Sequence, residues 1–279
     1  QWLWQKGAHT FEQMTNLSLS TRDLLQEHFV INHISVDHMQ RSSDGTIKNA
    51  VRLHDDLIVE SVLIPTKSRT TACVSSQVGC SLDCTFCATA RLKRMRNLNP
   101  DEIYDQVMAI HRESLLYHDR PLSNIVFMGM GEPLMNYNNV LMAIEKITGD
   151  EGLRMSPKRI TLSTSGVPKM IKKLADDEVK FHLALSLHSA IQEKRQVIMP
   201  FAERFVLDEV LEALVYWYEK TKRRVTFEYI VWDGFNDTDT DIQALVQFCK
   251  KVPCKVNIIE YNAIDDGTFK QAAVHRIEA

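Results

Sequence analysis

The chain has 279 residues, of which 44% are apolar and 25% charged, with a formal net charge of −3, as expected of a soluble globular protein with a sizeable core. This small negative charge gives no overall attraction to nucleic acid, so any RNA binding must depend on local basic patches. No apolar run reaches the length of a membrane span and the first residues lack the layout of a signal peptide, so we expect a cytoplasmic protein.

The first part of the chain predicts a small helical unit followed by a β-hairpin. Apolar residues recur at helical spacing up to about residue 38. Two β-rich runs follow at 46–53 and 57–64, separated by a short polar turn. In the second run, alternation puts Glu60 on the same side as Ile58 and Val62. A carboxylate in that position is more typical of an edge residue than of a catalyst.

From residue 71 onward, strand-like and helix-like segments alternate. The expected strands are 71–78, 124–128, 159–163, 180–187, 225–231 and 255–261. The expected helices are 100–117, 140–147, 168–174, 207–221 and 238–251. The first helix has the clearest start, because Asn99 can cap it, Pro100 takes its first position and Glu102 its third.

Strands joined by helices of this length predict parallel pairing through right-handed crossovers, and therefore an α/β fold. Six units are too few for a complete eightfold barrel, so we expect a partial (β/α)6 barrel similar to a TIM barrel. A doubly wound sheet is the alternative, because a count of units does not separate the two. Segment 181–188 favours the barrel, because its leucines alternate with small or polar residues that could line a cavity.

Three of the six cysteines, Cys80, Cys84 and Cys87, follow the strand at 71–78 with the spacing C-x3-C-x2-C. Three thiolates without a fourth ligand at a matching distance suit a 4Fe–4S cluster, because one iron then stays open for a small molecule. Zinc is the rival, although structural zinc prefers four protein ligands and catalytic zinc usually recruits histidine or a carboxylate.

Two basic patches are candidates for RNA contact. The first directly follows the cysteines and contains Arg91, Lys93, Arg94 and Arg96. The second, 222–224, lies between a helix and a strand and is more typical of a solvated loop.

The cysteine spacing after a first strand, with six βα units, resembles the radical S-adenosylmethionine (SAM) superfamily. Four segments resemble, more narrowly, the RlmN/Cfr family of RNA adenine methyltransferases: Cys73-Val-Ser-Ser-Gln-Val-Gly-Cys80, Gly129-Met-Gly-Glu-Pro-Leu134, Leu162-Ser-Thr-Ser-Gly166 and Ser186-Leu-His188. The resemblance covers about residues 1–262. It implies a truncated N-terminal helical accessory domain (1–42), a β-hairpin linker (43–66), a radical SAM core (67–262) and the start of a C-terminal segment (263–279).

The resemblance also implies roles for individual residues. The three cysteines would hold the cluster, and SAM would be bound by Gly131, Glu132, Ser163, Ser186, Leu187, His188 and Asn262. Cys73, which by itself reads as a core thiol, would resolve a covalent RNA adduct through a disulfide, and Glu60 would accept a proton.

The family carries the methyl group on a second cysteine in a C-terminal stretch that these 279 residues do not contain. Cys249 and Cys254 match no family motif and are expected to be structural. The chain therefore reads as a fragment without either end, expected to bind a cluster and SAM but not to complete methyl transfer.

The activity implied by the resemblance is methylation of adenosine C2 in the peptidyl-transferase region of 23S rRNA and next to the tRNA anticodon. The implied partners are these RNAs and an electron donor such as flavodoxin or ferredoxin, with a monomeric enzyme and no membrane. Two alternatives stay open. One is the C8-methylating resistance branch of the same family, and the other is a non-catalytic RNA-binding module stabilised by zinc or a cluster.

Overall fold

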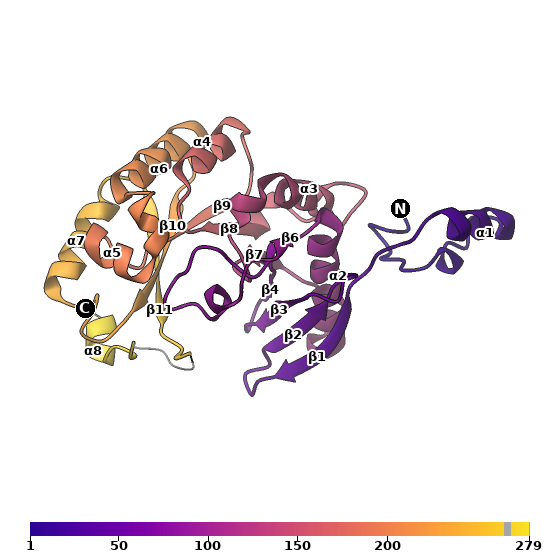
Figure 1. The fold of residues 1–279 in the computed structure, drawn as a ribbon, viewed down its shortest axis with the longest axis horizontal. Coiled ribbons are helices and arrows are strands. Elements are labelled where there is room, and N and C mark those ends of the chain that lie inside the picture. The colour runs from indigo at the N-terminus through magenta and orange to yellow at the C-terminus, as the bar shows by residue number, and fades with distance from the viewer. Residues whose placement is uncertain (265–268, 279) are drawn as a thin grey trace. The chain divides into compact units, whose positions relative to one another are not determined.

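The computed structural model describes residues 1–264 and 269–278. The chain forms two compact units, each built from separate segments (Figure 1). Unit 1 consists of Gln1–Val78, Arg96–Met130 and Asn136–Ile160, and unit 2 of Gly79–Met95, Gly131–Met135 and Thr161–Ala279. The division into four consecutive segments that the sequence resemblance implied stays a prediction.

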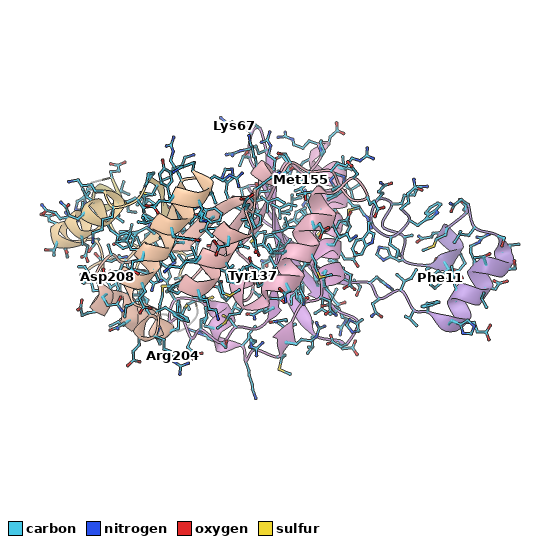
Figure 2. The ribbon with its side chains drawn as sticks, turned by 90° about the horizontal axis from the view of Figure 1, so that it is seen from above. Phe11, Lys67, Tyr137, Met155, Arg204 and Asp208 are labelled. Carbon is cyan, nitrogen blue, oxygen red and sulfur yellow. The ribbon has the colours of Figure 1, made fainter. Side chains whose placement is uncertain are left out.

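Unit 1 combines an antiparallel sheet with the first parallel strands. Its helices are α1 (Leu19–His28), α2 (Pro100–His118) and α3 (Tyr137–Thr148), and Tyr137 is labelled in Figure 2. Its strands are β1 (Ser35–Arg41), β2 (Ile47–Arg52), β3 (Ile58–Pro65), β4 (Thr70–Cys73), β5 (Gln77–Val78), β6 (Arg96–Asn97) and β7 (Asn124–Phe127). The order is β1-β2-β3-β4-β7, antiparallel up to β4, and β4 pairs with β7 in parallel. The predicted hairpin is β2–β3.

Unit 2 contains the later βα repeats. Its strands are β8 (Ile160–Thr164, in the unit from Thr161), β9 (His182–Ser186), β10 (Val225–Val231) and β11 (Cys254–Glu260). Its helices are α4 (Pro168–Asp176), α5 (Gln192–Ile198), α6 (Leu207–Thr221), α7 (Asp239–Cys249) and α8 (Val274–Ile277). Asp208 marks the first turn of α6 in Figure 2. The strands are parallel and in chain order, without the order reversal of a doubly wound sheet.

The predicted α/β class is confirmed, with parallel strands joined by helices. The start of α2 follows from its sequence, because the Asn99 backbone N–H donates to Glu102 Oε2 at 2.8 Å and Pro100 takes the first helical position. α4 and α6 pack side by side (Figure 1). Among the described residues, no helix combines the length and apolar character needed to cross a bilayer.

Several elements differ from the sequence prediction. The predicted strand 71–78 is split into β4 and β5, and β6 and α8 were not predicted. Helical spacing up to about residue 38 corresponds only to a short turn at Phe11–Gln13 and to α1, whereas Ser35–Arg41 forms strand β1. The reason is tertiary, since β1 pairs antiparallel with β2 and so overrides a weak local preference. The sequence prediction also omitted α5, which is too short for its periodicity to be recognised.

Candidate active site

The cysteine loop, residues 79–95, lies in unit 2 and is closed at its base. The Cys80 backbone N–H donates to the Leu92 carbonyl at 3.3 Å, and Cys80 forms a bridge with Lys93. Gly79 makes this closure possible. Its φ is +72°, and a Cβ atom there would lie 2.3 Å from the Lys93 carbonyl oxygen. The two ends of the loop are therefore held together by backbone contacts.

Inside the loop, the backbone folds the three cysteines toward one region. Asp83 takes a left-handed conformation with φ of 52°, and the Cys87 N–H donates to the Cys84 carbonyl at 3.1 Å. The Thr85 N–H donates to the carbonyl of Ile198 at 3.0 Å. This bond attaches the loop to the end of α5, where Cys84 packs against a buried cluster that includes Ile198 and Met199.

The thiols are close enough to interact electrostatically. Burial raises the pKa of both Cys80 and Cys84, and the charge of Cys87 raises each pKa further. All six cysteines are free thiols, so a disulfide bond is absent from the described cysteines. Because thiolates are the ligands of iron–sulfur clusters, cluster binding at this loop would have to release protons.

No group of three or more His, Cys, Asp or Glu side chains within residues 1–264 and 269–278 is placed to hold one metal ion. Three ligands of a cubane bind three different irons, so their sulfur atoms are farther apart than ligands that share one ion. The three thiols lie on one anchored loop and interact electrostatically, and thiolates are the donor set that such a cluster needs.

Glu132 lies in the same unit and has only 2% of its surface exposed. Its carboxylate accepts hydrogen bonds from Thr164 Oγ1 at 2.7 Å, from the Ser165 N–H at 2.7 Å and from the Leu134 N–H at 3.0 Å. Burial raises the pKa of Glu132, and these hydrogen bonds oppose that rise. Gly131, directly before it, has φ of +92°, so the turn requires glycine.

The ends of β8 and β9 supply two serines and a histidine. Ser163 and Ser186 come from neighbouring strands, and their hydroxyl oxygens are 3.5 Å apart. Leu187 is fully buried. His188 is buried with φ of +54°, and its ring lies edge-on to Phe86 of the cysteine loop, with centroids 4.8 Å apart.

His188 is held in one protonation state. Burial, and then the nearby charge of Arg195, lower the pKa of His188 to about 3. The Ile230 N–H donates to His188 Nδ1 at 3.2 Å. Nδ1 is therefore an acceptor, and the remaining ring proton of the neutral imidazole is on Nε2.

Within the described residues, Asn262, another residue predicted to bind SAM, has no observed contact with the serines and histidine at the ends of β8 and β9. It follows β11 and its side chain is exposed. Its neighbour Tyr261 is buried against Trp232, with ring centroids 5.9 Å apart. In the described part of the chain, we find no hydrogen bond from the Asn262 side chain to Ser186 or His188.

Cys73 and Glu60 lie together in unit 1. Cys73 is the last residue of β4 and pairs with Val62 of β3, two residues from Glu60. Burial and then the charge of Glu60 raise the pKa of Cys73 to about 11, while a hydrogen bond with the Met128 backbone partly opposes this. β3 is flanked by β2 and β4, so Glu60 is not on an edge strand. It is exposed and forms an ion pair with Lys48 at 2.6 Å.

Of the first basic patch, Arg91, Lys93 and Arg94 are exposed. Arg96 is different, because its guanidinium donates to Asp55 at 2.6 Å and twice to Glu102 at 2.7 Å. These charge-assisted bonds give Arg96 a structural role at the start of α2.

Arg195, which is fully buried at this site, was not predicted from the sequence. It belongs to α5, and its Nη2 donates to the carbonyls of Ser165 at 2.6 Å and Ser186 at 3.3 Å. Within the polar run 192–196 it resembles a solvated side chain. Its spacing from Ile191 and Ile198 is the signal that could have placed it on the buried side of a helix.

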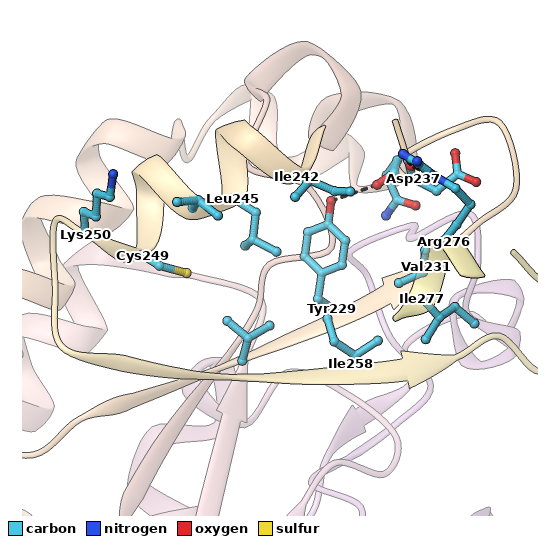
Figure 3. A pocket seen from close by; sticks show the side chains of 13 residues that line it. Tyr229, Val231, Asp237, Ile242, Leu245, Cys249, Lys250, Ile258, Arg276 and Ile277 are labelled. Atoms are coloured by element: carbon cyan, nitrogen blue, oxygen red, sulfur yellow. Dashed lines mark hydrogen bonds between the residues drawn. The ribbon is translucent and has the colours of Figure 1, made fainter. Parts of the chain in front are cut away.

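A separate cavity of about 510 Å³ lies between α7, α8 and strands β10 and β11 (Figure 3). Its lining is mainly apolar, and Tyr229 donates to the Asn236 carbonyl at 3.2 Å at one side. None of the predicted site residues lines this cavity. It is therefore distinct from the region around the cysteine loop.

Comparisons with known proteins agree with this geometry. Residues 74–248 match the model of the radical SAM superfamily, and residues 1–31 match a ribosomal RNA large subunit methyltransferase N-terminal domain. A probable dual-specificity RNA methyltransferase RlmN from Christiangramia forsetii is 75% identical over 98% of this chain and 78% of its own length. A protein of the same description from Flavobacterium johnsoniae is 71% identical over 100% of the chain and 80% of its own length.

A crystal structure of a radical SAM methyltransferase from Sphaerobacter thermophilus has the same fold, with a TM-score of 0.94 and 35% identity. The match covers 99% of this chain and 81% of that one. The chain thus belongs to the radical SAM superfamily and, within it, to the RlmN family of dual-specificity RNA methyltransferases.

Proposed function

We propose that this chain is the catalytic core of a radical SAM enzyme that methylates C2 of an adenosine in 23S rRNA and in tRNA. One observation carries the proposal. Unit 2 combines three free thiols on one anchored loop with the buried Glu132 carboxylate and the serines at the ends of β8 and β9. The full-length similarity to proteins described as dual-specificity RNA methyltransferases supports RNA as the substrate.

Cys80, Cys84 and Cys87 would hold a 4Fe–4S cluster, and a group of other residues in unit 2 would bind SAM. When bound, the cluster supplies the electron that cleaves SAM to a 5′-deoxyadenosyl radical. Glu132 would accept a hydrogen bond from the SAM ammonium group, and Gly131 would allow close approach of the backbone. The further SAM contacts that we propose are Ser163, Ser186, Leu187, His188 and Asn262.

His188 would act as a neutral donor. Its Nδ1 already accepts from the Ile230 N–H, so only Nε2–H can donate. A protonated histidine at this depth would be strongly disfavoured, because burial lowers the pKa of His188 to about 3. His188 can therefore orient a polar group of SAM without adding charge.

Cys73 and Glu60 would act on the RNA. Because the pKa of Cys73 is about 11, its thiol must first lose a proton. The Cys73 thiolate would then attack the sulfur of a methyl-carrying cysteine in the RNA adduct and form a transient disulfide. The bond between that sulfur and the RNA-bound carbon would break, and the carbon would keep the electron pair and take up a proton to become the methyl group. Glu60 would accept the proton from the adenine ring, a role that requires its carboxylate to leave Lys48. Arg91, Lys93 and Arg94 are the proposed phosphate contacts.

The remaining features are proposed on family grounds. They are a cytoplasmic, monomeric enzyme and an electron donor of the flavodoxin or ferredoxin class. No membrane partner is proposed, and the described helices include none that could span a bilayer.

Anaerobic reconstitution tests the proposal. We expect about four irons and four sulfides per chain and reductive release of 5′-deoxyadenosine from SAM. Zinc at about one per chain, without 5′-deoxyadenosine, would instead indicate a binding module stabilised by zinc. Mapping of the methyl group on the RNA product of a chain that includes a methyl-carrying cysteine separates the two regiochemistries, and a C8 product would contradict the C2 assignment.

A further inference from the structure

Arg195 is a buried cation without a carboxylate partner among the described residues. Its side chain is fully buried, and its Nε and Nη1 atoms have no hydrogen-bond partner. Only Nη2 is engaged, by the carbonyls of Ser165 and Ser186 at the ends of β8 and β9. A buried charge of this kind is costly unless another group compensates it.

The cysteine loop packs against the end of the helix that carries Arg195. The Thr85 N–H donates to the carbonyl of Ile198, three residues after Arg195 in the same helix, and Cys84 packs against the buried cluster that includes Ile198. Cys84 is the group whose charge raises the pKa of Arg195, which burial otherwise lowers to about 10. At that pKa the guanidinium stays positively charged at neutral pH.

Besides Cys84, the groups that contact or interact with Arg195 among the described residues are uncharged. They are the two carbonyls, the ring of Phe201 with its centroid 5.7 Å from the guanidinium carbon, and neutral His188. The neighbouring cation Lys194 has its own partner, because its Nζ donates to both carboxylate oxygens of Asp241 at 2.8 Å. Arg195 is therefore the cation of α5 whose charge is not neutralised by a carboxylate.

We propose that Arg195 is a positioning residue whose guanidinium compensates the negative charge of the cluster bound by Cys80, Cys84 and Cys87, and thereby raises its reduction potential. The inference rests on the proposed function, because it assumes that the cluster binds at these cysteines. A cluster held by thiolates is negatively charged, and reduction adds one further negative charge. A nearby buried cation stabilises the reduced state more than the oxidised state.

The free N–H groups have a second consequence. Nε–H and Nη1–H are unpaired donors, and hydrogen bonds to the sulfur atoms of a cluster also raise its potential. Arg195→Lys keeps the charge but not the fork of donors, whereas Arg195→Met removes both. The two variants therefore separate the contribution of charge from that of hydrogen bonding.

The test is an EPR-monitored redox titration of the reconstituted protein without SAM. For Arg195→Met we expect the equilibrium constant for reduction to fall at least tenfold, which for one electron is about 59 mV toward lower potential. The reduction potential of Arg195→Lys should lie closer to that of the parent than to that of Arg195→Met. Lys194→Met combined with Asp241→Asn is the matched control, since it removes a cation of the same helix together with the carboxylate that neutralises it, and its potential should equal that of the parent.

The outcomes separate this inference from the proposed function. If the parent protein takes up no iron and sulfide, both fail. If the parent binds the cluster and Arg195→Met has the parent's reduction potential, the inference alone is overturned. Weaker SAM binding by that variant would then place Arg195 in the SAM site.

If Arg195→Met does not fold, pulsed EPR of the parent labelled with 15N-arginine gives the answer. A 15N coupling to the reduced cluster that disappears in Arg195→Lys supports the inference, and its absence refutes it.

Discussion

Asp105 provides a quantitative test of the electrostatics of unit 1. It lies in α2 and lines a cavity of about 230 Å³ together with Asp101, His9 and His33. Burial, and then the like charge of Asp101, raise the pKa of Asp105 from 3.8 to about 6, although Arg112 and His33 lower it in part. Because the folded state binds the proton more tightly than the unfolded state, stability is lost as the pH rises from about 4 to about 6.

The magnitude follows from the size of this shift. About two pKa units correspond to about 3 kcal/mol of lost stability at neutral pH. Asp105→Asn removes this penalty but weakens the hydrogen bond from the Ile34 N–H, which costs about 1 kcal/mol. We therefore expect the free energy of unfolding of the variant to exceed that of the parent by about 2 kcal/mol at pH 7.5. At pH 5 this difference should be smaller by about 1 kcal/mol.

Urea unfolding of the cluster-free protein at both pH values measures this difference. Asp23→Asn, an identical change at an exposed position of α1, is the control and should stay within about 0.5 kcal/mol of the parent. The reasoning is wrong if Asp105→Asn is less stable than the parent at pH 7.5, or if its advantage does not grow with pH.

Three further predictions concern the site and its surroundings. Gly79→Ala should reduce iron and sulfide uptake on reconstitution, because its Cβ would collide with the Lys93 carbonyl. Gly234→Ala, also at positive φ but with open space around it, should keep the parent's uptake. An equal loss of uptake in both variants would point to backbone strain alone. Glu132→Gln should weaken SAM binding at least tenfold by calorimetry, because the amide lacks the charge that a SAM ammonium requires, and unchanged affinity would remove Glu132 from the SAM site. Arg96→Met should lower the free energy of unfolding in urea by about 3 kcal/mol, because it leaves buried Glu102 without its cation. Arg94→Met should keep the free energy of unfolding within about 0.5 kcal/mol of the parent. It should instead lower the salt dependence of RNA binding. Equal stability losses would contradict the different roles given to the two arginines.

Much of the fold could be predicted because the signals are local. The limits of α6 and β10 coincide with those expected from apolar periodicity, and α2 begins at the predicted cap of Asn99. Each of these signals depends on residues within one or two turns of each other, so no tertiary information is needed. The cysteine spacing is equally local, since one short loop carries all three thiols.

The face exposed by a strand could not be predicted in the same way. Alternation correctly put Glu60 with Ile58 on one side of β3, but the buried side is the other one, with Val59, Ser61 and Leu63. Periodicity determines which residues share a face, while the elements that cover the sheet determine which face is buried.

Local sequence signals predicted the α/β class and the order of the βα units, and the cysteine spacing put three thiols on one loop. Only the tertiary structure decided which charged side chains are buried and with which partners. Arg96 and Arg94 are nearly adjacent in sequence, yet one is paired with Asp55 and Glu102 and the other is exposed. Arg195, inside a polar run, is a fully buried cation that interacts electrostatically with Cys84. The physical reason is that desolvation and Coulomb energies depend on distances across the fold, which residue spacing along the chain does not specify.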